Sequence, residues 1–259
     1  RVLVSGSAVG IYGDAASEVV TEERKPANDF LAKLCVDWEA EALRAEEHGV
    51  RVAIPRTGIV LGAEGGALAS MLPPFRAGLG GPIGHGKQFM AWIHLSDVLE
   101  ILAQALVDNT FRGPFNLAAP EPVTSEEFAR ALGKAVRRPA RVRAPAFALK
   151  LALGEAAGVL LASQRAKPAK LTSWGYKFAW PDLQSTLRDV LEGGAPEIGA
   201  APKSLPKTEY LARRGATHVL ATETTLDAPL SEVFEFFSAA ENLGALTPPA
   251  LSFEIQPPL

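Results

Sequence analysis

The sequence predicts an α/β fold built on a parallel β-sheet, and its first sixty residues supply the evidence. Val2, Leu3 and Val4 form a short apolar run that ends at Ser5 and Gly6, which is typical of a strand buried on both faces. Residues 50–61, VRVAIPRTGIVL, form a second apolar run, and residues 29–49 follow a helical pattern. A strand, a helix and a strand in this order indicate a βα unit of a parallel sheet.

Small residues follow the first strand and lead to Tyr12, Gly13 and Asp14. In open α/β sheets, ligands bind outside the carboxyl ends of the strands, so we expect Ser5, Ser7 and Tyr12 to face a crevice. An ordinary strand and turn without a functional role is the alternative interpretation of the same residues.

The first helix is expected to begin at Asp29, its N-cap, and to end at Gly49. Apolar residues recur between them at a spacing of about 3.6 residues, which predicts one buried face. That face contains Phe30, Leu31, Leu34, Cys35, Trp38, Ala42 and Leu43. The other face carries Lys33, Asp37, Glu41 and Arg44.

The middle of the chain contains a predicted helix, a glycine-rich loop and a strand. Pro73 and Pro74 are expected to interrupt the helix at 67–79, because proline removes a backbone donor. The loop at 78–86 lacks the GxxxxGK motif and follows no clear strand, so we expect no phosphate-binding loop there. The strand is predicted at 89–94.

Two later helices begin at recognisable capping residues. Ser96 or Asp97 is expected to cap the first, at 98–107. Thr124 and Glu127 form a capping box for the second. The other expected elements are a strand at 114–117 and helices at 125–136, 146–161, 167–174 and 183–191.

Composition excludes several classes of function. With 259 residues, 47% of them hydrophobic, the chain can form a sizeable core and more than one domain. A net charge of −3 argues against binding to nucleic acid or an anionic membrane, and no apolar stretch approaches the roughly 20 residues of a membrane span. Four scattered histidines have no metal-ligand spacing, so no metal site is predicted. The single cysteine, Cys35, fits a reducing compartment, and we expect a cytoplasmic protein.

The two ends of the chain suggest a fragment of a longer protein. The sequence opens on a strand without Met or a preceding glycine-rich loop, and it stops after a strand-like run. Residues 193–216 are rich in Gly, Ala and Pro and are predicted to be a linker. Residues 217–259 are interpreted as the truncated start of a second domain.

Several motifs occur in the order of one known protein class. VSGSAVGIYG resembles a strand with a catalytic Ser, PRTGIVLG a strand beside the nicotinamide, and WIHLSDV and GPFNLAAPEPVTSEEFARALG two later segments. Together they resemble the extended short-chain dehydrogenases/reductases, which include nucleotide-sugar epimerases and dehydratases. PAFALKLALGE, SQRAKPAKL and GYKFAWPDL resemble the C-terminal module of an atypical, epimerase-like group within that class, some of whose members are labelled cell-division inhibitors.

The resemblance implies a domain plan. Residues 1–140 would be the C-terminal part of a Rossmann-type, doubly wound sheet that binds NAD or NADP, and residues 141–192 a small α+β module on the substrate side. The tail, with TTLDAPLSEVFEFFSAAENLGALTPP, is similar to the opening of the START-like helix-grip proteins, which bind apolar ligands.

The resemblance also implies catalytic residues, with one departure. Ser7 matches the Ser that positions the substrate oxygen, and Ser5 is the alternate. Family members carry Tyr-x-x-x-Lys on the following helix, where this chain has Cys35 and Glu39. Cys35 could act as an acid whose pKa an adjacent carboxylate would raise. A small buried cysteine on the apolar face is the alternative.

Further site residues are assigned by position. Tyr12, Arg56, Thr57 and Gly58 are expected, with Ser5, to contact the cofactor, Gly58 by permitting close backbone approach. The residues expected to contact substrate are Gln88, Trp92 and Arg165, with Lys170 as a further cation for an anionic substrate. His94 is expected to be structural.

Two classes of function fit these assignments. The first is an NAD(P)-dependent epimerase/dehydratase-like oxidoreductase that acts on a small molecule and whose proton is handled by Cys35, water or the substrate. The second is a non-catalytic NAD(P)-binding sensor or scaffold. A third alternative, which concerns the tail, is that the helix-grip domain delivers an apolar ligand to the reductase-like domain. The sequence leaves the substrate and the oligomeric state open.

Overall fold

The computed structural model describes residues 1–62, 65–153 and 157–192. All of them lie in the first of two units, Arg1–Gly199. The predicted linker at 193–216 and the predicted helix-grip start at 217–259 lie outside the described residues. These two assignments remain predictions.

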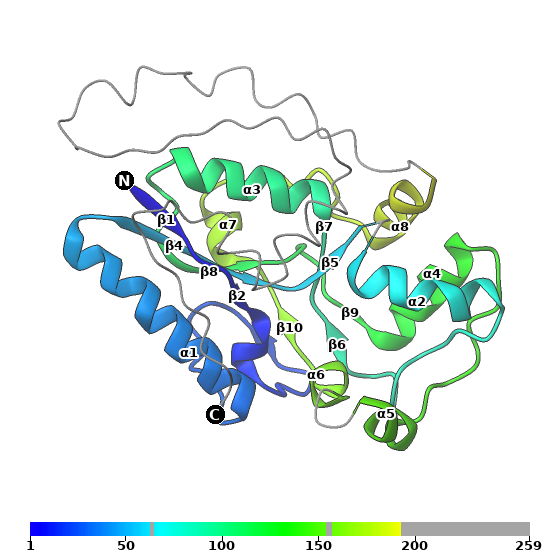
Figure 1. Cartoon of the computed structure of the whole chain (residues 1–259). Helices are drawn as coiled ribbons and strands as arrows, with labels where there is room; N and C mark the ends of the chain where they lie inside the picture. Colours follow the sequence, from blue (N-terminus) through cyan, green and yellow to red (C-terminus); the bar gives the residue numbers. More distant parts are fainter. Residues whose placement is uncertain (63–64, 154–156, 193–259) are drawn as a thin grey trace, which may run out of the picture. The chain divides into compact units, whose positions relative to one another are not determined.

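A parallel sheet forms the centre of the described region (Figure 1). Its middle strand is β4 (Arg51–Thr57), whose residues from Ala53 onward pair with β8 (Gly113–Leu117). Strands β1 (Val2–Val4) and β2 (Ser7–Ala8) pair with successive parts of β4. All these pairings are parallel, which confirms the predicted α/β class.

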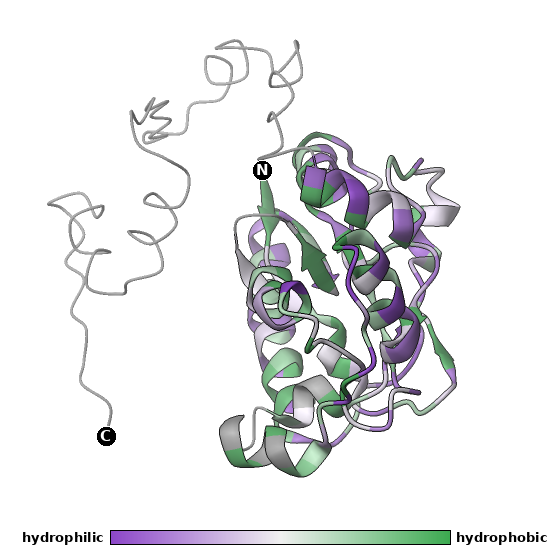
Figure 2. Cartoon of the chain, turned by 90° about the vertical axis from the view of Figure 1, so that its right-hand side faces the viewer, coloured by the Kyte–Doolittle hydropathy of each residue, from purple (hydrophilic) through white to green (hydrophobic). Residues whose placement is uncertain are grey.

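Helices α1 (Phe30–Leu43) and α3 (Leu95–Val107) lie on opposite faces of this sheet (Figure 1). Successive residues of a strand point to opposite faces. Accordingly, Val52 and Ile54 of β4 pack with Ala42 of α1, while Ala53 packs with α3. Figure 2 shows the largely hydrophobic strands in the interior. The sheet is therefore the core on which the site is built.

The buried face of α1 differs from the predicted one. Phe30 and Trp38 are 82% and 61% exposed, and Leu34 is also exposed. The residues that face the protein are Ala32, Cys35, Glu39 and Ala42. Small side chains let the helix approach the sheet closely, and a charged residue sits among them because its partner lies on β4.

Strand β1 is also less buried than predicted. Val4 packs with the α3 side, but Leu3 points to the other face and is 37% exposed. The expectation of burial on both faces was therefore wrong for this strand.

Each of the two long predicted strands is two short ones. Residues 50–61 form β4 and β5 (Ile59–Leu61), and residues 89–94 form β6 (Phe89–Met90) and β7 (Trp92–His94). Strand β5 leaves the central sheet and pairs with β7, while β6 pairs antiparallel with β9 (Val123–Thr124). The chain therefore changes partners where a single strand was expected.

Capping was predicted correctly where it is local. The side chain of Asp29 accepts a hydrogen bond from the Ala32 amide, and Thr124 and Glu127 form a complete capping box at α4 (Ser125–Ala135). The cap of α3 was assigned wrongly, because it is His94, whose Nδ1 accepts from the Ser96 amide. Helix α2 (Gly66–Arg76) continues through both prolines, whose carbonyl oxygens still accept backbone bonds.

The segment after residue 140 is made of short elements. The predicted helix at 146–161 contains α5 (Ala146–Leu153) and α6 (Ala157–Leu161), and the one at 167–174 shortens to α7 (Ala169–Ser173). Helix α8 (Leu183–Glu192) packs on α4. Strand β10 (Arg165–Ala166) pairs with β3 (Val19–Val20), which brings this segment back to the loop after β2.

Candidate functional site

Three polar side chains lie in one line across the central sheet. Ser7 of β2 is paired with Arg56 of β4, which is paired in turn with Asn116 of β8. Side chains at paired positions of neighbouring strands project from the same face. Glu39 of α1 and Tyr12, which ends the short helix η1 (Val9–Tyr12), complete the group. We call these five residues the sheet network.

A buried ion pair forms the centre of the sheet network. Nε of Arg56 lies 2.8 Å from Oε1 of Glu39, and Nη2 lies 2.7 Å from Oε2. Each side chain is only 8% exposed. Two parallel bonds hold the guanidinium and the carboxylate in a fixed orientation. The two charges compensate each other inside the protein, so the loss of either would leave the other unpaired.

Hydrogen bonds extend the network on both sides of this pair. The hydroxyl of Ser7 donates to Oε1 of Glu39 at 2.7 Å. On the other side, Nη1 of Arg56 donates to the Tyr12 hydroxyl at 3.0 Å. Tyr12 donates in turn to Oδ1 of Asn116 at 2.7 Å. A continuous chain of polar contacts therefore runs from Ser7 to Asn116.

Asn116 connects this chain to the C-terminal segment. Its Nδ2 donates to the carbonyl oxygen of Lys167 at 2.9 Å. Its backbone amide donates to Oε1 of Glu22, which also accepts from the Lys170 amide. The loop after β2 and the segment around β10 thus meet at the sheet network.

Burial controls the protonation of the acids in this group. It raises the pKa of the Tyr12 hydroxyl above its usual value, although the Arg56 charge opposes the shift. Burial also raises the pKa of the Cys35 thiol, which is 2% exposed and lies beside Ser7. The predicted direction for Cys35 is confirmed, but burial contributes more than Glu39 does. For Arg56, the bonds to Glu39 and Tyr12 outweigh burial and raise the pKa.

Ser7 is the member of the sheet network whose hydroxyl oxygen can still accept a hydrogen bond from a ligand. Its single proton is directed to Glu39, so the lone pairs of Oγ can accept a hydrogen bond from another group. Tyr12 is 1% exposed and both donates and accepts within the network. A hydroxyl that approached Ser7 would therefore meet an acceptor backed by a carboxylate.

The residues expected to contact the cofactor fall into two groups. Tyr12 and Arg56 are buried and direct their polar atoms at each other, while Ser5 and Thr57 are partly exposed near the carboxyl ends of adjacent strands. Gly58 does permit a close approach, but of Ala91: a Cβ at this glycine would lie 2.8 Å from the Ala91 carbonyl oxygen. The structure therefore accounts for Gly58 by packing of β5 beside β7.

The residues expected to contact substrate have their described partners outside the sheet network. Trp92 is 1% exposed and belongs to the core, with its indole N–H donating to the Glu121 carbonyl, and its contact with substrate stays a prediction. Gln88 is also buried and donates to Ile83, and the guanidinium of Arg165 lies over the ring of Phe89.

His94 is structural, as predicted. Its Nε2 lies 3.1 Å from Oδ2 of Asp189, and its ring stacks on Trp180. Desolvation lowers its pKa. Asp97, whose carboxylate accepts from the Tyr176 hydroxyl and two backbone amides, holds the same C-terminal segment.

Sequence reasoning missed two members of the site. Asn116 lies within the predicted strand at 114–117, in a motif used only for the resemblance, and a polar residue inside a buried strand was the available signal. Glu22 lies in a polar loop with no recognisable pattern. Its partners are 94 and 148 residues away, so only the fold brings them together.

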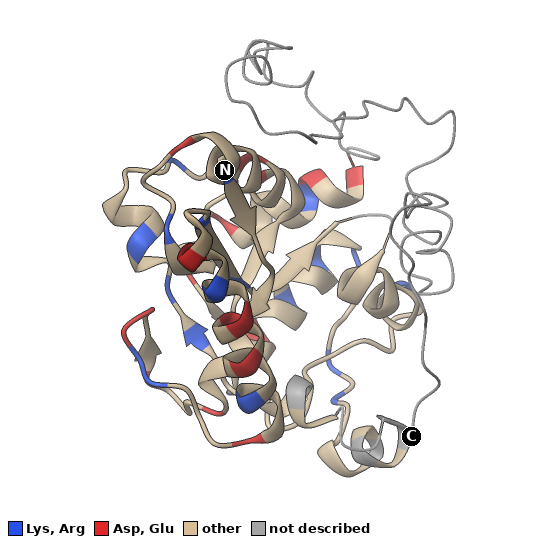
Figure 3. Ribbon diagram, turned by 60° about the vertical axis from the view of Figure 1, so that its left-hand side comes forward, with Lys and Arg blue, Asp and Glu red and all other residues tan. Residues whose placement is uncertain are grey.

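The described ranges contain neither a membrane-spanning helix nor a metal-type cluster. No described helix is long and apolar enough to cross a bilayer, and within these residues no three His, Cys, Asp or Glu side chains gather as metal ligands would. Figure 3 shows α1 with both acidic and basic residues along its length.

Two family descriptions match the chain. Residues 1–118 match the NAD dependent epimerase/dehydratase family, and residues 144–190 match a domain of unknown function, DUF1731. A chloroplastic SDR39U1 homolog of Arabidopsis thaliana is 40% identical over 191 residues, which is 74% of this chain and 55% of the relative. An epimerase family protein of Mycobacterium leprae is 44% identical over 179 residues, 69% of this chain and 58% of the relative.

Solved structures agree with these matches. A crystal structure of human epimerase family protein SDR39U1 with NADPH has 36% identity and a TM-score of 0.71, and covers 74% of this chain and 65% of that one. A nucleoside-diphosphate sugar epimerase from Corynebacterium glutamicum has 34% identity and a TM-score of 0.58, and covers 73% of this chain and 37% of that one. The chain thus spans little more than half the length of the first two curated relatives.

Proposed function

We propose that the chain is part of an NAD(P)-dependent oxidoreductase or epimerase acting on a hydroxyl-bearing small molecule, because residues 1–118 match the NAD dependent epimerase/dehydratase family. The observation that carries the proposal is the hydrogen bond from Ser7 to the buried Glu39. It leaves an acceptor at the carboxyl ends of the parallel strands, where α/β proteins bind their ligands.

The cofactor is proposed to be NADPH or NADH. The human relative crystallised with NADPH supports this choice. Ser5 and Thr57 fit the nicotinamide end, because both are partly exposed hydroxyl residues, Ser5 directly after β1 and Thr57 at the end of the neighbouring strand β4. Tyr12 and Arg56 fit it less well, because their polar atoms serve the sheet network. When bound, the nicotinamide accepts or returns a hydride.

The proton that accompanies hydride transfer needs an acceptor in this chain. The substrate hydroxyl would pass its proton to Oγ of Ser7 while the proton of Ser7 passes to Oε1 of Glu39. Arg56 holds that carboxylate in position through two bonds, so the acceptor stays aimed at Ser7. In the reverse direction the same two groups return the proton. Glu39 would thus take a role that Tyr and Lys take in typical family members.

Titration of the intact protein with NADPH and NADH tests the cofactor assignment. We expect saturable binding that changes the nicotinamide fluorescence. No binding at millimolar cofactor would contradict the proposal. Binding without turnover of any hydroxyl substrate would favour the sensor or scaffold function instead.

Single substitutions test the proton path. Ser7→Ala and Glu39→Gln are expected to lower turnover about 10²-fold or more while cofactor binding is retained. Cys35→Ala is the matched control on the same helix, and we expect it to keep turnover if Glu39 is the acceptor. Loss of turnover in Cys35→Ala with full activity in Glu39→Gln would assign the proton to the thiol.

A further inference from the structure

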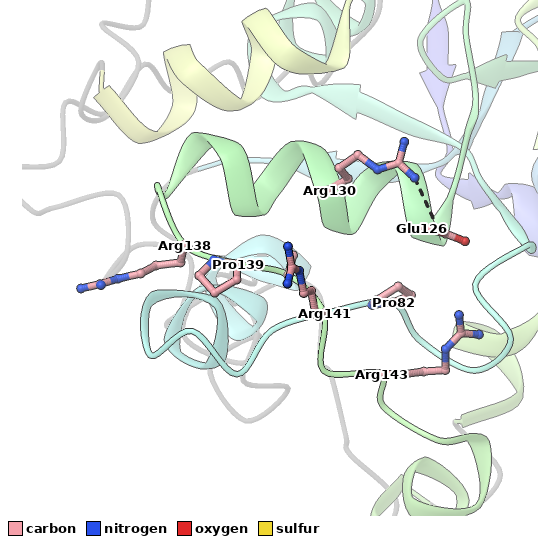
Figure 4. A pocket seen from close by; sticks show the side chains of 8 residues that line it. Pro82, Glu126, Arg130, Arg138, Pro139, Arg141 and Arg143 are labelled. Carbon is pink, nitrogen blue, oxygen red and sulfur yellow. Dashed lines mark hydrogen bonds and ion pairs between the residues drawn. The ribbon is translucent and has the colours of Figure 1, made fainter.

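A cluster of arginines lines a cavity that the sheet network does not use. The cavity has a volume of about 470 Å³ and is lined by Pro82, Glu126, Arg130, Arg138, Pro139, Ala140, Arg141 and Arg143. Figure 4 shows Arg130 on α4, with Arg141 and Arg143 on the segment that follows it, while Arg138 extends away from the other three. Cavities of this size hold small-molecule ligands.

The alternation of side chains explains why two arginines share this cavity. The segment 140–144 is extended and forms a parallel bridge between Ala144 and Ile83. Arg141 and Arg143 are two residues apart, so they project to the same side. Val142 and Ala144 project to the other side and line a separate apolar cavity.

The backbone of this segment is fixed. The Val142 amide donates to the Gly80 carbonyl at 3.1 Å, and the Ala144 amide donates to Pro82 at 2.9 Å. A Cβ at Gly81 would lie 2.3 Å from the Val142 carbonyl oxygen, so the two strands of chain run in direct contact. The arginines therefore extend from a rigid support, which limits the entropy lost when they bind a ligand.

The charges in the cavity are poorly balanced. Glu126 is the only acidic lining residue, and it pairs with Arg130 at 3.4 Å, with 50% and 74% of the two side chains exposed. Within the described part of the chain, no salt bridge involves Arg138, Arg141 or Arg143, and Arg143 donates weakly to the Gly84 carbonyl at 3.3 Å. The local excess of positive charge contrasts with the net charge of −3 of the whole chain.

We propose that this cavity binds the phosphate group of a phosphorylated small molecule through Arg130, Arg141 and Arg143. Guanidinium groups form paired hydrogen bonds with phosphate oxygens, which favours arginine where phosphate is recognised. The volume exceeds that of one phosphate ion and leaves room for the organic part of the ligand. The glycine-rich loop at 78–86 contributes Pro82 to the wall, and the phosphate contacts come from side chains instead of a backbone cradle.

Calorimetric titration of the intact protein at constant ionic strength tests the site, with pyrophosphate and glucose 1-phosphate as probes and glucose as the uncharged control. Arg141→Gln is expected to weaken binding of both phosphates roughly ten-fold. Arg112→Gln removes an equal charge at an exposed site elsewhere and should change the affinity little. Glucose should not bind.

A substitution that is expected to strengthen phosphate binding distinguishes a loss of the site from misfolding. Glu126→Gln removes the only negative charge in the wall and releases Arg130, so phosphate binding should strengthen about three-fold. Equal affinities in Arg141→Gln and Arg112→Gln, or weaker binding in Glu126→Gln, would overturn the proposal. A lipid surface as the ligand would also overturn it. In that case the protein would sediment with vesicles that contain phosphatidic acid, this binding would require Arg141, and pyrophosphate would not compete with it.

Discussion

The sheet network and the arginine cavity use the same residue type in opposite ways. Arg56 is buried, and its guanidinium is bonded to Glu39 and Tyr12. Arg141 and Arg143 are exposed and have no salt-bridge partner among the described residues. A buried charge must be compensated within the fold, so it holds the protein together. An exposed charge costs little to leave unpaired and stays available to a ligand.

The largest expected effect is the removal of the buried cation. Arg56→Met leaves the buried charge of Glu39 without its cationic partner, so the free energy of unfolding should fall by about 3–5 kcal/mol. Chemical denaturation measures the change, with Arg112→Met as the exposed control. Equal losses of unfolding free energy in the two variants would show that the buried Arg56 stabilises the fold no more than an exposed arginine does.

A smaller loss is expected when the hydroxyl of Tyr12 is removed. Tyr12→Phe keeps the ring but leaves Nη1 of Arg56 and Oδ1 of Asn116 without this partner, at a cost of about 1–3 kcal/mol. A double-mutant cycle with Asn116→Leu should give a coupling energy clearly above zero. Additive effects would show that the network is not coupled.

Lowering the pH is expected to reduce the free energy of unfolding through the buried His94. Its pKa is lower in the folded state than the value of about 6.5 in the unfolded chain, because desolvation disfavours the charged ring. The unfolded state then binds more protons below pH 6.5, so this contribution to stability is present above that pH and is lost as the pH falls towards the folded pKa. The slope is at most about 1.4 kcal/mol per pH unit.

Denaturation between pH 7 and pH 5 measures this slope, and the His94→Gln variant provides the reference. The difference between the two proteins should shrink with acid. A constant difference would mean that His94 does not change its protonation on unfolding.

The smallest effect is expected in the arginine cavity. Arg130→Gln and Arg141→Gln should each change the free energy of unfolding by less than about 0.5 kcal/mol, because exposed ion pairs contribute little. Thermal denaturation without added phosphate measures this. A loss of 2 kcal/mol or more in either variant would show that these arginines stabilise the fold and are not free to bind a ligand.

Features that depend on neighbours in sequence could be predicted. Asp29 and the Thr124–Glu127 capping box follow local rules, and the order of strand and helix gave the parallel sheet. The hydrogen bond from Ser7 to Glu39 brings two of the predicted residues together, while their catalytic role stays a prediction.

Features that depend on distant partners could not be predicted. The stripe Phe30, Leu34 and Trp38 has ideal helical spacing, yet it is exposed because the opposite stripe meets the sheet. Glu39 looked like a departure from a catalytic pattern, whereas its partner Arg56 lies 17 residues on, beyond any helical spacing. The arginine cavity likewise requires Pro82 and Arg141, which are brought together by backbone contacts between segments about sixty residues apart in the sequence.

The alignment of Ser7, Arg56 and Asn116 across three strands has a consequence for folding. A slip of β4 by one residue would move Arg56 to the α3 face, away from Glu39, and would place a charge in an apolar layer. The penalty for that slip includes the whole cost of an unpaired buried charge as well as the lost packing. The ion pair therefore stabilises one strand register over the alternatives. This matters in a sheet of such short strands, because each strand has few other contacts that fix its register.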